Sequence, residues 1–164
     1  MIPVGIAGIL DVALHIIFAS IAMIILVWGR EENFDPLKII AFAFLMEIVI
    51  DGAHLVNKDY THNIFFLLEL PLLFLFIGFM DGNAKLEKFS LLLLANNWTH
   101  LVMDLFYEGD ALHLYYPVSN ITVDACGAGF VPGLLLWILL LLPIWLSARK
   151  LDITQPLSPP PYPT

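Results

Sequence analysis

His100 and Asp104 lie four residues apart in an apolar stretch that runs from Asn96 to Leu105. In a helix this spacing puts both side chains on one face, about one turn apart. Imidazole and carboxylate groups are the protein ligands of Zn²⁺ and, with more oxygens, of Mn²⁺ or Fe²⁺. In so apolar a segment these groups are costly unless they face a polar interior and have partners there. The pair therefore predicts further polar side chains on neighbouring segments.

The composition is that of a helical membrane protein. The chain has 164 residues, of which 60% are hydrophobic and 13% are charged, whereas a soluble domain has about half and about a quarter. Its apolar runs are long enough to span a bilayer as helices. The seven basic residues form no patch and the net charge is −8, which excludes a nucleic-acid partner. The single cysteine, Cys126, excludes an intrachain disulfide.

Five apolar segments predict an all-α polytopic membrane protein with about five transmembrane helices in one bundle. The segments run approximately over residues 11–29, 37–55, 61–80, 86–107 and 129–146. We place one membrane domain at 1–148, with a less apolar outer loop at 108–127. A Pro-rich tail follows at 149–164.

The basic residues predict the orientation of this bundle in a prokaryotic plasma (inner) membrane. Six of them fall on one side of the five-span topology: Arg30, Lys38, Lys85, Lys88, Arg149 and Lys150. Only Lys58 falls on the other side. Because cytoplasmic loops carry the excess of basic residues, we predict an N-terminus outside and a cytoplasmic tail. The first apolar run is long for a signal core and has no basic residue before Arg30, which favours a retained anchor.

The ionisable residues of the first four segments share one half of the membrane in this topology. They are Asp11, His15, Glu47, Asp51, His54, His62, Glu69, His100 and Asp104. Antiparallel helices joined by short loops would bring these side chains together. We rank Glu69 below the others, because it lies beside Pro71 and can satisfy backbone groups that the proline leaves unbonded.

A divalent cation is the leading explanation for so many ionisable groups at one depth, because it offsets the repulsion among several carboxylates. A His/Asp site with an open position acidifies a bound water and polarises a substrate oxygen, which is the chemistry of hydrolysis. Two alternatives stay open. Single pairs can be interhelical hydrogen bonds, and the whole set can be a metal-free network that lines a proton or ion path.

The polar residues also stand in recognisable blocks: Thr99-His100 with Asp104-Leu105, then Gly109 and Leu-Tyr-Tyr-Pro-Val-Ser at 114–119. This pattern resembles the signature of the YdjM family, small bacterial and archaeal proteins described as membrane-bound, metal-dependent hydrolases. The stretch Ile50–His54 resembles that family's Pro-Asp-x-Asp-His block, and Tyr60–Ile64 resembles its Thr-His-Ser/Asn block. The resemblance covers approximately residues 11–120.

The resemblance implies a ligand set: His15, Asp51, His54, His62, His100 and Asp104. It also implies zinc as the most favoured metal, with manganese, iron or copper as alternatives, because the family is distantly related to zinc-dependent phospholipase C and P1-type nucleases. Ala53 stands at the position of the family's second aspartate, and Asn57 stands about where a histidine often precedes the Thr-His pair. These departures favour one metal over a multi-metal cluster, or a chain in which hydrolysis is lost.

The leading functional hypothesis is a metal-dependent membrane hydrolase that acts on a lipid-borne phosphoester or a related bond. Its site would lie in the outer half of the bilayer, under the loop 108–127. The general base for the bound water would be whichever of Asp51 and Asp104 does not bind the metal, or Glu47, one turn below Asp51.

The competing hypothesis is a non-catalytic metal-binding accessory subunit of a larger membrane complex. Copper would then be held by Asn96 or Asn97 together with His100 and His113. The partners expected under the two hypotheses are membrane lipid, other membrane subunits, or a second copy of the chain in a homo-oligomer.

Overall fold

The chain folds into a bundle of helices. The computed structural model describes residues 6–27, 35–108, 112–125 and 130–153. Five α-helices occur in the described residues: α1 (Ile6–Val27), α2 (Pro36–Gly52), α3 (Leu70–Asp81), α4 (Ala84–Met103) and α5 (Phe130–Ile153). The only β pairing among the described residues is an isolated bridge between Leu112 and Val123. The predicted all-helical class is therefore confirmed.

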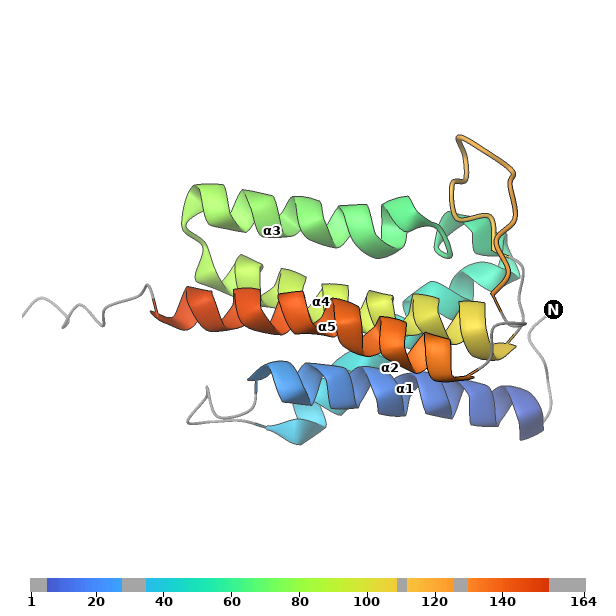
Figure 1. The fold of residues 1–164 in the computed structure, drawn as a ribbon, viewed down its shortest axis with the longest axis horizontal. Coiled ribbons are helices and arrows are strands. Elements are labelled where there is room, and N and C mark those ends of the chain that lie inside the picture. Colours follow the sequence, from blue (N-terminus) through green and yellow to red (C-terminus); the bar gives the residue numbers. More distant parts are fainter. Residues whose placement is uncertain (1–5, 28–34, 109–111, 126–129, 154–164) are drawn as a thin grey trace, which may run out of the picture.

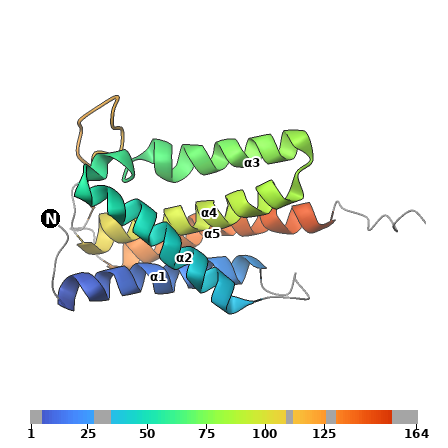
Figure 2. The same cartoon turned by 180° about the vertical axis from the view of Figure 1, so that it is seen from behind.

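Helix α4 is the centre of the bundle. It packs against α1, α3 and α5, and α1 in turn packs against α2 (Figures 1 and 2). Every residue from Leu93 to Met103 is buried. The segment that carries the His100–Asp104 pair is thus surrounded by the other helices, as its polar groups require.

The outer surface of the bundle is apolar, and its interior is partly polar. Helix α2 shows this most clearly, because its buried residues are Ala43, Glu47 and Ile50. Its exposed side chains include Phe44, Leu45, Ile48 and Val49. A helix on the surface of a soluble protein has the opposite pattern, with polar residues outward.

Two helical regions are long and apolar enough to cross a membrane, Ile9–Val27 and Lys58–Asp81, and Val131–Leu146 is a shorter apolar helix. Helix α2 has only 17 residues, and α4 carries charged and amide groups along its length, so neither has the length and hydropathy of a span by itself. The five-span topology and its orientation stay predictions.

Short turns set the helix boundaries. Asp35 accepts a hydrogen bond from the backbone N–H of Leu37 and caps α2, which begins at Pro36. Gly82, with a φ of 62°, ends α3 in the left-handed conformation that favours glycine. Helix α5 continues to Ile153, into the segment that we assigned to the tail.

Four short helical segments in the described residues lie around one end of the bundle. Two are 3-10 helices after α2, η1 (Ala53–Leu55) and η2 (Lys58–Tyr60). Two are π-helical, η3 (Phe65–Glu69) before α3 and η4 (Asp104–Glu108) after α4. Pro71 accounts for η3, because its missing N–H interrupts the regular hydrogen-bond ladder. The π turns flank the polar residues, where such turns often mark functional sites.

Candidate metal centre

Six of the polar residues singled out in the sequence meet at one end of the bundle, beside the loop 112–125. His15 comes from α1, Glu47 and Asp51 from α2, His62 from the turn after η2, His100 from α4, and Asp104 from the start of η4. All except Asp51 are buried, with exposed fractions of 1–3%. The predicted convergence of four segments on one polar site is therefore present in the fold.

Two ring nitrogens face each other at the centre of this group. Nε2 of His62 and Nε2 of His100 lie 3.1 Å apart. Oδ2 of Asp104 lies 3.3 Å from Nε2 of His100 and 3.6 Å from Nε2 of His62. Oδ1 of Asp51 lies 3.8 Å from Nε2 of His100 and 3.5 Å from Nε2 of His62. The other oxygen of Asp104, Oδ1, lies 3.1 Å from Nε2 of His15.

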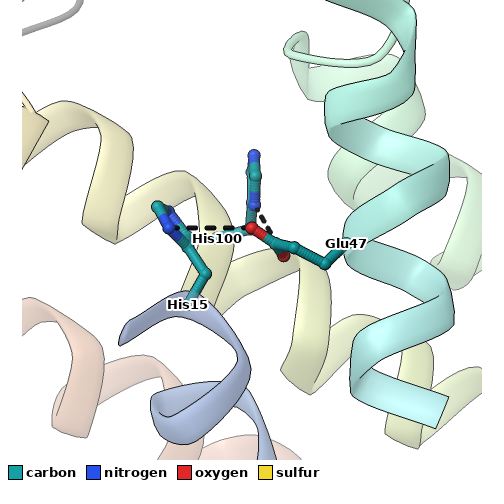
Figure 3. A group of neighbouring side chains, drawn as sticks. All are labelled: His15, Glu47 and His100. Carbon is teal, nitrogen blue, oxygen red and sulfur yellow. Dashed lines mark hydrogen bonds and ion pairs between the residues drawn. The ribbon is translucent and has the colours of Figure 1, made fainter. Parts of the chain in front are cut away.

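The opposite nitrogen of each imidazole faces a hydrogen-bond acceptor. Nδ1 of His100 donates to Oε2 of Glu47 at 3.2 Å (Figure 3). Nδ1 of His62 lies 3.1 Å from the backbone oxygen of Lys58, and Nδ1 of His15 lies 3.2 Å from that of Asp11. A carbonyl or carboxylate oxygen can only accept, so each of these contacts needs a proton on Nδ1.

The Nε2 atoms lie on the inner side of the group: those of His62 and His100 face each other and Asp104, and that of His15 faces Asp104. Imidazole nitrogens and carboxylate oxygens that converge in this way can bind a cation, and in its absence protons on Nε2 can bond to the carboxylate of Asp104. A histidine whose second nitrogen donates to a carboxylate or a backbone carbonyl is also the usual arrangement in metal sites, because that bond fixes the ring and its tautomer.

The distances suit a divalent ion. The donor atoms of Asp51, His62 and His100 all lie within 4.8 Å of one another. Two ligands of a tetrahedral zinc ion, each at about 2.0–2.1 Å, are about 3.4 Å apart. The separations among His62, His100 and Asp104 are 3.1, 3.3 and 3.6 Å, close to that value. The buried group can therefore hold a metal ion, and its geometry does not select the metal.

His15, Glu47 and His100 form a second group whose donor atoms lie within 4.8 Å of one another. In Figure 3 the carboxylate of Glu47 faces both imidazoles, 3.6 Å from Nδ1 of His15 and 3.2 Å from Nδ1 of His100. It therefore contacts His100 on the side of the ring opposite Asp104 and His62. That position suits a residue that orients His100.

The centre opens to its surroundings at Asp51. The side chain of Asp51 is 32% exposed, in contrast to the almost fully buried histidines. A Cβ placed on the neighbouring Gly52 would meet no atom within 4 Å, so there is open space at that position. Asp51 is therefore the most accessible member of the group.

Thr61 and Asn63 fix the position of His62 from both sides. The hydroxyl of Thr61 donates to the backbone oxygen of Ile50 at 2.8 Å, which ties His62 to the end of α2 next to Asp51. The amide oxygen of Asn63 accepts from the backbone N–H of Phe66 at 2.9 Å. Both residues are buried. Neither residue was assigned a role from the sequence, although their positions directly before and after His62 could have indicated one.

The remaining predicted residues lie elsewhere. Glu69 is exposed and does not belong to the group. From the sequence we rank it below the other candidates. His113 donates to Oδ1 of Asp59 at 2.9 Å, so the alternative copper set is not assembled around His100. The backbone of His54 lies in η1, but its side chain lies outside the described part of the chain, as does Cys126.

Comparison of the chain with protein-family models, with curated proteins and with solved structures finds no match. The resemblance to the YdjM family thus rests on the sequence blocks alone and stays a prediction.

Proposed function

We propose that the chain is a membrane-embedded, divalent-metal-dependent hydrolase that acts on a lipid-borne phosphoester or a related bond. The observation that supports it best is the set of three imidazole Nε2 atoms and two carboxylates that converge inside the bundle. The apolar outer surface supports a location in the membrane, with five helices in the bilayer and the centre in its outer half.

The residues divide into distinct roles under this proposal. His62, His100 and Asp104 hold the ion, because their separations match a ligand set and all three are buried. The ion would acidify its bound water and polarise a substrate oxygen. Asp51, the exposed carboxylate at the open side, is placed to accept the proton of that water. Glu47 orients His100, a position that fits a general base less well than Asp51 does.

His15 belongs to the support of the ion site. Its Nε2 contacts the oxygen of Asp104 that faces away from His62 and His100. This contact sets the rotation of the carboxylate, so that Oδ2 is turned toward the two ligand histidines. Ligand carboxylates in metal sites are held by outer partners in this way.

Metal content tests the first half of the proposal. Protein purified in mild detergent without chelator is expected to carry about one equivalent of zinc or another divalent metal per chain by elemental mass spectrometry. His100→Ala should lose it, whereas His113→Ala, which changes a histidine outside the centre, should keep it. Metal-free wild type, or equal loss in both variants, would reject the metal centre.

Hydrolysis tests the second half. Wild-type protein loaded with metal and reconstituted in phospholipid vesicles should release a soluble phosphorylated headgroup or inorganic phosphate. Asp51→Asn should retain the metal and lose the activity, since it removes the base and keeps the ligands. Loss of both in Asp51→Asn would instead make Asp51 a ligand and Asp104 the base.

The accessory-subunit hypothesis has one observation in its favour. The histidines and Asp104 are almost fully buried, which leaves only the side at Asp51 for a reacting molecule. Under this hypothesis the metal stabilises the fold, and a stoichiometric membrane partner co-purifies with the chain while phospholipid is not hydrolysed.

A further inference from the structure

An apolar groove runs along α4, between α3 and α5, and has a volume of about 300 Å³. Helices α3 and α5 both pack against α4, and they lie apart from each other in Figure 1. Leu91, Leu94 and Trp98 of α4 form the floor of the groove, and its walls include Leu72 of α3 and Pro143 of α5. The floor residues are only 5–8% exposed, whereas Leu72 is 48% exposed. The groove therefore opens on the outer surface of the bundle.

The groove is long and narrow. Its floor residues lie on one face of α4 and span seven residues, which is about 10 Å along the helix axis. Spread over that length, its volume corresponds to a width of about 6 Å, whereas a helix with its side chains is about 10–12 Å wide. The dimensions therefore suit a single extended chain, and a helix of a partner or of a second copy is too wide to enter.

The lining selects the chemistry of this chain. Every residue around the groove is a leucine, an isoleucine or a proline, except Trp98. No charged or hydroxyl side chain lines it, so a polar ligand would lose its hydrogen bonds to water without replacing them. A hydrocarbon chain loses none, and it gains dispersion contacts with leucine side chains that otherwise have no neighbour on that side.

The groove is separate from the metal centre. His100 follows Trp98 by two residues, which is about 200° around the helix. The floor of the groove and the ligand histidine therefore lie on nearly opposite faces of α4, and an occupant of the groove does not displace any residue of the centre.

We propose that the groove between α3 and α5 holds one acyl chain of a bilayer phospholipid. In the membrane the groove opens directly onto lipid, whose acyl chains are as apolar as leucine. The inference rests on the membrane location in the proposed function. It does not depend on the metal or on hydrolysis.

Photolabelling of the full chain in phosphatidylcholine vesicles tests the proposal. The probe is a phosphatidylcholine that carries a diazirine in one acyl chain, and peptide mass spectrometry locates its adducts. Adducts are expected on Leu91 and Leu94, which are too deeply buried to meet lipid that only touches the outer surface. Phe76 on α3 and Leu139 on α5 are 61% and 66% exposed, so their adducts report lipid on that outer surface.

Leu72→Trp fills the groove from its wall and should lower the adducts on Leu91 and Leu94 several-fold, with those on Leu139 unchanged. Leu75→Phe, at another lining position, is the smaller second variant and should act in the same direction. Leu73→Trp is the matched control, because Leu73 is 52% exposed on the same helix and does not line the groove. It should label as the wild type does.

The outcomes separate this proposal from the proposed function. Labelled Phe76 and Leu139 without adducts on Leu91 and Leu94 would overturn the acyl-chain site and leave the membrane location standing. Unchanged floor adducts in both groove variants would also overturn the site. Absence of adducts on Phe76 and Leu139 as well would overturn the membrane location, and the acyl-chain site with it.

Discussion

The role of Glu47 gives the sharpest quantitative prediction. Its Oε2 accepts the Nδ1 proton of His100 at 3.2 Å in a site where both residues are 1–2% exposed. Glu47→Gln keeps an oxygen that can accept this proton and removes the negative charge. The ring orientation is thus retained in part, while the basicity of Nε2 falls.

Removal of a residue that orients a metal ligand costs about 10–100-fold in metal affinity. Because glutamine keeps an acceptor, we expect the lower end for Glu47→Gln, about tenfold or about 1.4 kcal/mol. Glu47→Ala removes the acceptor and should approach about 100-fold.

Competition against a chromophoric zinc chelator measures these affinities in detergent. Glu69→Gln is the matched control, because it makes the same substitution at an exposed position outside the centre, and it should bind zinc as the wild type does. Unchanged affinity in Glu47→Gln, or an equal loss in both variants, would refute the role of Glu47 as the residue that orients His100.

Four further predictions concern stability. Zinc at about 100 times its dissociation constant should stabilise the fold by about 2.7 kcal/mol, seen as a rise in the melting temperature that chelator reverses and that His100→Ala lacks. Gly78→Ala should destabilise the α3–α4 hairpin by about 1–3 kcal/mol, because its Cβ would lie 2.9 Å from a backbone nitrogen of α4. Gly52→Ala should be neutral or stabilising in the same thermal assay, since open space surrounds that position. Thr61→Val removes the hydrogen bond to Ile50 and should lower the stability by about 1 kcal/mol. It should also lower the metal affinity. Unchanged stability and unchanged metal affinity would show that this bond does not position the site.

The sequence by itself determined the helical class and the candidate polar residues. Periodicity and length identify helices because backbone hydrogen bonds within a segment are local. The four-residue spacing of His100 and Asp104 predicts a shared face for the same reason. An imidazole or a carboxylate inside an apolar segment requires partners, so the sequence also indicated that the polar residues of different helices would meet.

Only the tertiary structure decided how those residues are used. Whether Glu47 faces Nδ1 or Nε2 of His100 depends on how α2 crosses the bundle, which no spacing within one segment specifies. The structure likewise placed His113 against Asp59 and left Glu69 on the surface, although both are as polar as the residues of the centre. Backbone oxygens of Asp11 and Lys58 contact Nδ1 of two histidines, and the sequence carries no mark of that role because every residue has such an oxygen. Local chemistry can be read along a chain, whereas the meeting of side chains from distant segments depends on packing.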